Sequence, residues 1–192
     1  MTYAVIFDLE FTAWQGSMEH RWSRPGEFRE VVQIGAVKAD ASTFAIVGEF
    51  NVLAKPRLNP VLSHYFEELT GVTNAALART GVDFAVAYRA FVEFAGGSPL
   101  FAFGRDDLVL RDNLALYGMN AMPDLPAFTN IAPWLAARGI DPRGLHACDI
   151  ARVAGARFSG RRHDALDDAR SVVAGVAALI ARGAPNPFVG EA

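Results

Sequence analysis

Two acids lie two residues apart at the end of an apolar stretch near the N-terminus, residues 5–12. The β-branched and aromatic side chains of this stretch favour a buried strand. Side chains alternate along a strand, so we expect Asp8 and Glu10 on one face, roughly 6–7 Å apart. Two buried like charges need a positive partner, and a hard divalent cation prefers oxygen ligands. Acids are also common where a strand emerges into solvent, so this motif alone leaves both interpretations open.

A second group of acids, Asp106 and Asp107, follows a short apolar run at residues 100–103 and Gly104. This order predicts a strand, a turn and the first residues of a helix. Acids in a first helical turn interact favourably with the helix dipole, so capping alone can explain them. A third group, His163 to Asp168, opens the last predicted helix, and Asp164 can serve as its N-cap. His20, His64 and His146 are interpreted as structural or solvated.

The elements that must position these acids follow from hydrophobic periodicity. Runs at residues 31–39 and 44–53 predict two more strands, joined by a turn at 40–42, so the chain opens with three antiparallel strands. The polar stretch 13–30 predicts a long loop, and such loops are often functional. Apolar spacing predicts helices at 84–95, from 107 to 117, at 131–138, at 145–155 and from 163 to 181, with shorter helices at 63–69 and 74–78 and strands at 100–103 and 127–130.

Strands followed by alternating helices and strands indicate an α/β fold with a mixed central sheet flanked by helices. The chain has 192 residues and no repeat, which suits one domain over residues 1–183, and we expect 184–192 to form a loose tail. Its net charge of −3 gives no global attraction to nucleic acid. Lone Cys148 and the absence of a signal-like or membrane-spanning stretch lead us to expect a cytoplasmic protein that does not contact membranes.

Taken in order, the three acidic motifs resemble those of the DEDDh family of 3′→5′ exonucleases. The motifs are Asp-x-Glu at Asp8, Gly-x-x-Asp at Gly104, and His-x-x-x-x-Asp at His163. The segments 30–37 and 66–73 are also similar to family segments, the second to a Leu-Thr-Gly-Ile motif. The long tryptophan-bearing loop and the Phe-Gly-x-x-Asp form resemble most the Eri/KapD-like branch. The resemblance covers residues 3 to 181.

This resemblance implies an RNase H-like fold and two divalent cations, Mg²⁺ or Mn²⁺. Asp107 is preferred to Asp106 because the family's acid follows Gly-x-x, and Asp168 to Asp167 because it falls five residues after His163. His163 is then the general base, which takes a proton from the attacking water near neutral pH. The implied metal ligands are Asp8, Glu10, Asp107 and Asp168.

The implied reaction is hydrolysis of phosphodiester bonds at the 3′ end of single-stranded nucleic acid, RNA favoured over DNA, with release of nucleoside 5′-monophosphates. The side chains expected to bind this substrate are Phe11, Thr12, Trp14, Thr70, Arg161 and Arg162. For the aromatic residues core packing is an equal alternative, and for the arginines a solvated surface is. Other functions left open are an oligoribonuclease-like or proofreading exonuclease and a non-catalytic nucleic-acid-binding module. Some relatives dimerise to complete a binding surface, so a homodimer is open too.

Overall fold

The computed structural model describes residues 2–189, which form a mixed sheet with helices on both faces. In these residues the strand order is β4-β3-β2-β1-β5-β6. The strands β1, β2 and β3 pair antiparallel, whereas β4, β5 and β6 run parallel to their neighbours. This arrangement confirms the predicted α/β fold with three antiparallel N-terminal strands. The strands are β1 (Tyr3–Phe11), β2 (Val31–Asp40), β3 (Ile46–Lys55), β4 (Val82–Asp83), β5 (Leu100–Ala102) and β6 (Phe128–Asn130).

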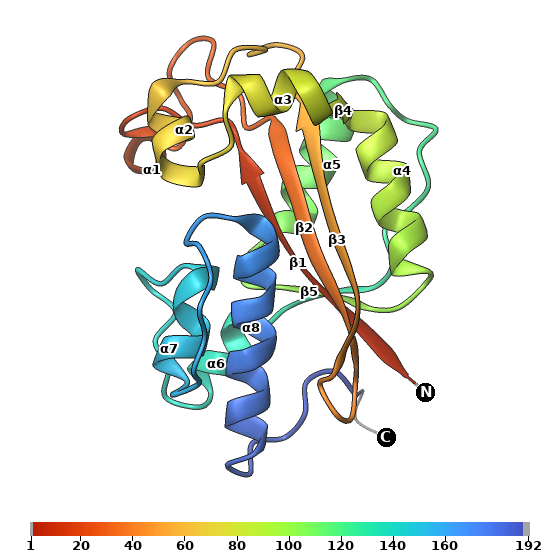
Figure 1. The fold of residues 1–192 in the computed structure, drawn as a ribbon, viewed down its shortest axis with the longest axis vertical. Helices are drawn as coiled ribbons and strands as arrows, with labels where there is room; N and C mark the ends of the chain where they lie inside the picture. Colours follow the sequence, from red (N-terminus) through yellow and green to blue (C-terminus); the bar gives the residue numbers. More distant parts are fainter. Residues whose placement is uncertain (1, 190–192) are drawn as a thin grey trace.

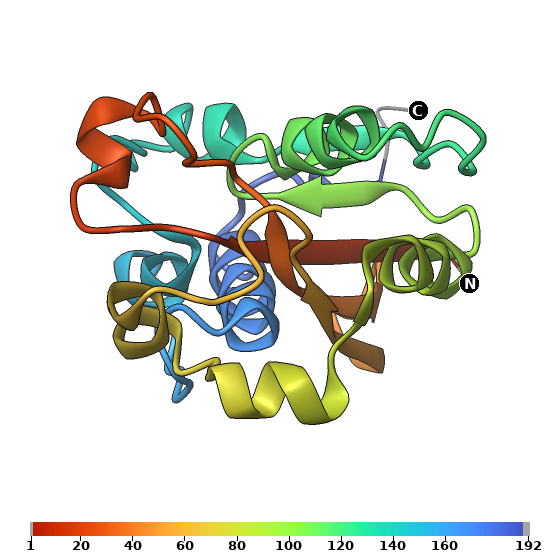
Figure 2. The same ribbon diagram turned by 90° about the horizontal axis from the view of Figure 1, so that it is seen from above.

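The helices lie on opposite sides of the sheet, with α8 on one side of β1, β2 and β3 and α4 and α5 on the other (Figures 1 and 2). A short 3₁₀ turn, Ala147–Asp149, leads directly into α7. The helices are α1 (Ser17–His20), α2 (His64–Thr70), α3 (Asn74–Thr80), α4 (Phe84–Ala95), α5 (Asp106–Leu116), α6 (Ala132–Ala136), α7 (Ile150–Val153) and α8 (Ala165–Ile180).

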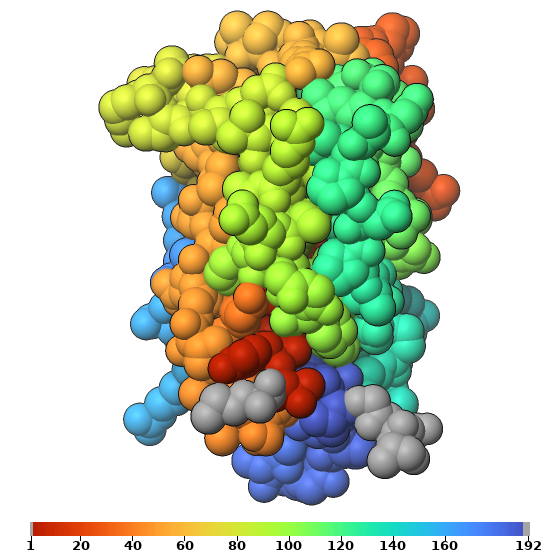
Figure 3. Space-filling model, turned by 90° about the vertical axis from the view of Figure 1, so that its right-hand side faces the viewer, coloured from red at the N-terminus to blue at the C-terminus, as the bar shows by residue number. Residues whose placement is uncertain are grey.

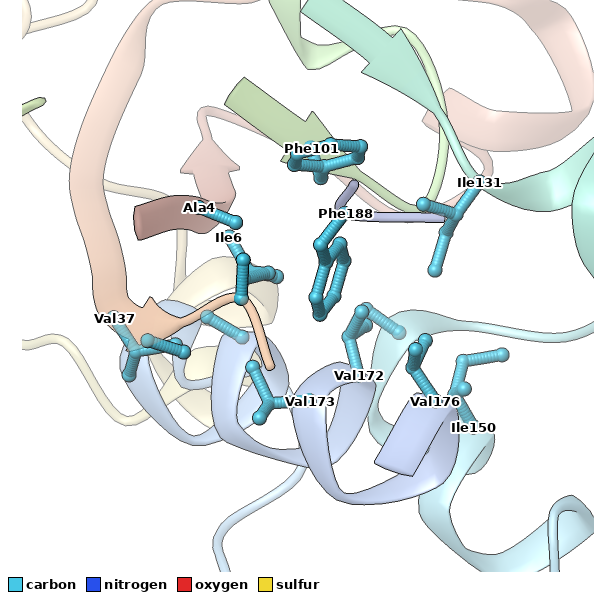
Figure 4. Close-up of a cluster of buried hydrophobic side chains, with 14 of the residues drawn as sticks. Ala4, Ile6, Val37, Phe101, Ile131, Ile150, Val172, Val173, Val176 and Phe188 are labelled. Atoms are coloured by element: carbon cyan, nitrogen blue, oxygen red, sulfur yellow. The ribbon is translucent and has the colours of Figure 1, made fainter. Parts of the chain in front are cut away.

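The core under α8 is built from the alternate residues of β1 that include Ala4 and Ile6. They meet the apolar stripe of α8, to which Val172 and Val176 belong, as Figure 4 shows. Burying such side chains contributes roughly 1.5–3 kcal/mol each. The long helix that carries Asp168 is therefore held firmly against the strand that carries Asp8.

The intervening residues of β1 face the second core. Val5, Phe7 and Leu9 pack against α4 and α5, where Phe7 and Phe91 have ring centroids 5.1 Å apart. Figure 3 shows α4 lying beside the segment that follows α5, and the Tyr88 hydroxyl donates to the Pro123 carbonyl across this contact. Both faces of β1 are thus covered along its length, and only its carboxyl end is left to form a site.

Three details differ from the sequence predictions. Residues 184–189 are not loose: Phe188 is 2% exposed and packs against Phe101 in the core under α8, with ring centroids 4.8 Å apart (Figure 4). Residues 190–192 of the predicted tail lie outside the described residues. The loop 13–30 contains the short helix α1, and the helix predicted at 145–155 is shortened to the 3₁₀ turn and α7.

Within residues 2–189, every helix is too short or too polar to cross a bilayer.

Candidate active site

The first two acids occupy the carboxyl end of β1 and face the first turn of α8. Asp8 and Glu10 stand opposite Gly35 and Gln33 of β2 in the antiparallel register. A Cβ atom on Gly35 would lie 2.1 Å from the backbone nitrogen of Leu166, so only glycine allows α8 to approach this closely. The glycine beside Asp8 thereby brings the start of α8 onto the sheet at the level of the acids.

Gln33, which also belongs to β2, binds the N-terminus of α8 through its side chain. Its side-chain amide donates to the Asp164 carboxylate at 3.1 Å, and its oxygen accepts the backbone N–H of Ala165 at 3.2 Å. Asp164 is the N-cap that the sequence predicted, since its carboxylate accepts the backbone N–H of Asp167. Asp168, one turn further on, is held against the end of β1 as a result.

The middle motif contributes Asp106 to the site, and not Asp107. Asp106 lines the pocket that contains Asp8 and Glu10, and it is close enough to Asp8 for their charges to interact. Asp107 instead receives two hydrogen bonds from the Arg105 guanidinium, at 2.8 and 2.9 Å. The preference for Asp107 is therefore corrected. Counting from Gly104 assumed a fixed connection length, whereas the direction of the helix face decides which acid points inward.

His163 and Asp168 complete the group. Donor atoms of Glu10, His163 and Asp168 all lie within 4.8 Å of one another. His163 has a φ of 57°, a left-handed conformation that turns the chain into α8. Its ring meets the His146 ring at a centroid distance of 5.2 Å, edge to face.

The pocket around these residues has a volume of about 480 Å³, within the range of small-ligand sites. Its charged lining is acidic, with histidines but no lysine or arginine. The carboxyl end of β1 lies between the α1–α2 region and the start of α8 (Figure 1). The pocket is lined by Asp8, Leu9, Glu10, Phe11, Ala13, Trp14, Ser17, Met18, Glu19, Trp22, Tyr65, Phe66, Leu69, Phe103, Asp106, Leu145, His146, Ala147, His163 and Asp168.

Crowding and burial perturb these carboxyl groups strongly. Burial raises the pKa of both Asp106 and Asp168 to about 7, and neighbouring acids add to the effect. The pKa values of Asp8 and Glu10 lie well above their ordinary values for the same reasons. By contrast, the Arg105 guanidinium lowers the pKa of Asp107. An acid cluster of this kind is stabilised in its ionised form by a cation.

The chemistry of the donor set fits a divalent metal. Asp168 is 2% exposed, and its Oδ1 atom is buried without a hydrogen-bond partner among the described residues. A buried unpaired carboxylate oxygen costs free energy that a coordinated cation removes. Hard cations such as Mg²⁺ and Mn²⁺ take carboxylate oxygens as ligands. The residues present therefore suit such a metal.

The predicted substrate-binding residues divide into two groups. Phe11 and Trp14 line the pocket. Thr12 and Thr70 do not: both are 2% exposed, and their hydroxyls donate to the carbonyls of Phe28 and Phe66. These threonines are corrected to structural residues, because their hydroxyl groups already hold the backbone around the pocket.

Arg161 and Arg162 also lie outside the pocket lining. The Arg161 guanidinium packs on Gly71, where an added Cβ would approach it to 1.9 Å. Arg162 forms an ion pair with Asp149 at 3.2 Å. The structure therefore separates the two arginines, which the sequence treated as a pair, and only Arg162 faces a neighbouring cleft.

Most of the pocket lining was not predicted from the sequence, and two of the missed residues, His146 and Tyr65, carry polar groups suited to binding. His146 was interpreted as structural or solvated, but it is exposed at the pocket and touches His163. Tyr65 lies in the first turn of α2, one residue before the segment that resembles the family. Its spacing of four from Leu69, which also lines the pocket, was an available signal.

A mixed sheet with three acid-bearing elements meeting a histidine at the end of its first strand defines the fold and site of a DEDDh-type nuclease. The model of the exonuclease family matches residues 5–175, and the chain belongs to this family.

Its curated relatives are distant. ERI1 exoribonuclease 2 of Homo sapiens is 25% identical over 88% of this chain, which spans only 27% of the length of that protein. The 3′-5′ exonuclease eri1 of Schizosaccharomyces pombe is 22% identical over 90% of this chain and 66% of its own length. A solved nuclease domain of 3′hExo, a DEDDh member bound to rAMP, superposes with a TM-score of 0.78 and 21% identity, covering 95% of this chain and 93% of that one. The RNase H-like fold and the resemblance to the Eri-like branch are confirmed.

Proposed function

We propose that this chain is a metal-dependent 3′→5′ exonuclease that releases nucleoside 5′-monophosphates from single-stranded nucleic acid, preferring RNA to DNA. The observation that carries the proposal is the meeting of Asp8, Glu10, Asp106 and Asp168 with His163 in one pocket. These five side chains come from three separate parts of the chain. Membership of an exonuclease family supports hydrolysis of phosphodiester bonds as the reaction of this pocket.

The four carboxylates are proposed to hold two Mg²⁺ or Mn²⁺ ions. Such a pair lowers the pKa of the attacking water and stabilises charge on the attacking and leaving oxygens. The carboxylates would balance the charge of the cations, and the orphaned Oδ1 of Asp168 would gain a partner. The net acidity of the pocket is then no barrier to a phosphate group, because bound cations dominate the local field.

His163 is proposed as the general base. Burial lowers its pKa, and His146 and Arg162 lower it further, so the imidazole is neutral near pH 7 and can accept a proton. Its donor atoms lie beside those of Glu10 and Asp168, where the attacking water would be held. The left-handed backbone at His163 directs the ring from the loop into this position.

The aromatic wall opposite α8 is proposed to receive the 3′-terminal nucleotide. Phe11 and Trp22 pack with their rings tilted by 59° and centroids 5.4 Å apart, and the Trp22 indole donates to the Thr12 carbonyl at 2.8 Å. Trp14 and Tyr65 present further ring surface to the pocket. Stacking on such rings contributes about 1–3 kcal/mol per base and tolerates any sequence. This wall suits an unpaired terminal base.

The preference for RNA rests on the relatives. The human relative is named an exoribonuclease, and the solved nuclease domain was bound to rAMP. A further solved 3′-exonuclease structure concerns a histone mRNA stem-loop; it superposes with a TM-score of 0.77.

The test uses RNA and DNA strands labelled at either the 5′ or the 3′ end, incubated with Mg²⁺, Mn²⁺ or EDTA. We expect a 5′-labelled strand to shorten stepwise, a 3′-labelled strand to yield labelled mononucleotide at once, and both reactions to stop in EDTA and in Asp8→Ala. Asp112→Asn, which changes an exposed acid of α5, is the matched control. Internal cuts, or shortening that survives Asp8→Ala, would refute the proposal.

A further inference from the structure

A second cleft, of about 540 Å³, lies directly behind the wall of the catalytic pocket. Ala147 and His163 line the pocket, while their chain neighbours Cys148 and Arg162 line this cleft. The two spaces therefore share a wall made of residues 146–149 and 162–163. We call the second cleft the arginine groove. It is lined by Cys148, Asp149, Arg152, Gly155, Ala156, Arg157, Phe158, Gly160 and Arg162.

The lining of the arginine groove is positively charged, unlike that of the neighbouring catalytic pocket. It contains three arginines and one acid, whereas the chain as a whole has a net charge of −3 and the catalytic pocket has no arginine or lysine. Arg152 and Arg162 meet the same oxygen of Asp149, at 2.9 and 3.2 Å, and Asp149 is almost fully buried beneath them. One carboxylate thus fixes two guanidinium groups side by side.

Most hydrogen-bond donors of these guanidinium groups have no partner within residues 2–189. The side chains of Arg152 and Arg162 are 69% and 60% exposed, and each gives Asp149 a hydrogen bond from one nitrogen. Arg157 is exposed and has no ion pair among the described residues. Guanidinium forks with free donors match the oxygens of phosphate groups. The groove therefore presents preorganised positive charge that its single acid, Asp149, only partly balances.

Phe158 adds a flat apolar surface to the groove. Its ring lies over Gly160, where a Cβ would approach it to 2.5 Å, and the ring is half-buried. An aromatic face among phosphate-binding side chains is the combination found in grooves that follow single-stranded nucleic acid. A free anion such as inorganic phosphate would use the arginines but not the ring.

We propose that the arginine groove binds the sugar–phosphate backbone of the nucleotides on the 5′ side of the scissile bond. The inference rests on the proposed exonuclease function, because the 3′-terminal nucleotide then fills the catalytic pocket and the rest of the strand must leave it. The strand crosses the shared wall and meets Arg152, Arg157 and Arg162, with a base against Phe158. The groove thereby makes the enzyme prefer strands longer than a dinucleotide.

The test measures binding of a fluorescent 12-nucleotide RNA by anisotropy in EDTA, where hydrolysis is suppressed. The double variant Arg152→Ala/Arg157→Ala should bind about tenfold or more weakly at ~0.1 M salt, and its plot of log affinity against log salt should be shallower by about 1.4, or ~0.7 per lost phosphate contact. Arg89→Ala, an exposed arginine of α4, is the matched control and should bind like the unchanged chain. Thermal melts check that each variant is folded.

Two further arms separate the explanations. Arg157→Glu removes no ion pair seen in the described part of the chain, so it should weaken binding with an unchanged melting temperature. The ratio of kcat/KM for the 12-mer to that for a dinucleotide should fall about tenfold in the double variant. If the double variant has the same affinity and salt slope as Arg89→Ala, the proposal that the groove binds RNA is wrong. If the unchanged chain does not hydrolyse RNA, the proposed exonuclease function is wrong. The binding measurement would still show whether the arginine groove binds RNA.

Discussion

Two regions of this molecule bury carboxylates in opposite ways. Glu30 has no exposed surface, and its oxygens accept the backbone N–H groups of Arg57, Leu58 and Asn59 at 2.6–2.7 Å and the Tyr117 hydroxyl at 2.5 Å. The acids at the end of β1 face one another, and the Oδ1 of Asp168 has no partner among the described residues. Burial of an acid is therefore not itself a sign of function. A buried acid whose partners are missing from the protein is such a sign.

The largest effect is expected where the partner is missing. Asp168→Asn should lower the exonuclease rate by about a hundredfold to a thousandfold, as loss of a group that stabilises transition-state charge does. The melting temperature of the metal-free protein should stay level or rise, because the change removes a charge that Asp8 and Glu10 repel. Rates on labelled RNA and thermal melts measure both effects. A variant that melts much earlier would show that Asp168 is structural.

The satisfied carboxylate should give the opposite pattern. Glu30→Gln keeps the shape but leaves one oxygen to accept the four hydrogen bonds. Hydrogen bonds to a buried charged group contribute enough that the loss should be about 2–4 kcal/mol. The melting temperature should fall by roughly 5–15 °C, while the rate per folded molecule changes little. A stable but inactive Glu30→Gln protein would show that Glu30 serves the reaction and not the stability of the fold.

The acid cluster also predicts a pH dependence for the metal-free protein. Burial raises the pKa of Asp106 and Asp168 from 3.8 to about 7, so the native state binds more protons than the unfolded state between about pH 4 and 7. These groups therefore lower the free energy of unfolding as pH rises through that window. Melts in EDTA should show this decline, and Asp106→Asn/Asp168→Asn should flatten it. If the double variant shows the same dependence of melting temperature on pH, the two acids are not its cause.

The smallest effect is expected at the ion pair beside the cluster. Arg105→Gln removes a half-exposed guanidinium from Asp107, and pairs of this kind contribute about 0–1 kcal/mol. The melting temperature should fall by at most ~4 °C, and the rate should remain within about threefold. Steady-state rates on RNA check this, with Asp112→Asn as the exposed-acid control. A hundredfold loss would place this pair within the catalytic machinery.

The local parts of this fold were predictable from the sequence because their periodicity is strong. The alternation along β1 placed Asp8 and Glu10 on one face, and the apolar stripe of α8 placed Asp168 toward the sheet. The choice between Asp106 and Asp107 failed because motif spacing outweighed helix geometry. Both acids are buried in the first turn of α5, but Asp106 lines the pocket with Asp8 and Glu10, whereas Asp107 is paired with Arg105.

Other features depend on contacts between distant segments. Phe188 packs into the core although the residues before it, Pro185, Asn186 and Pro187, show no hydrophobic periodicity. The contact of Gly35 with α8 joins positions about 130 residues apart in the chain. The arginine groove likewise forms only when α7 and the loop before α8 pack together. No local pattern carries this information.

The most direct test is a calorimetric titration of Mn²⁺ into the unchanged chain, Asp106→Asn and Asp107→Asn at pH 8, without nucleic acid. The neighbouring acids differ in one respect: Asp106 faces the cluster, and Asp107 is paired with Arg105. We expect Asp107→Asn to bind Mn²⁺ like the unchanged chain and Asp106→Asn to bind it at least tenfold more weakly. Normal binding by Asp106→Asn with loss in Asp107→Asn would contradict the account.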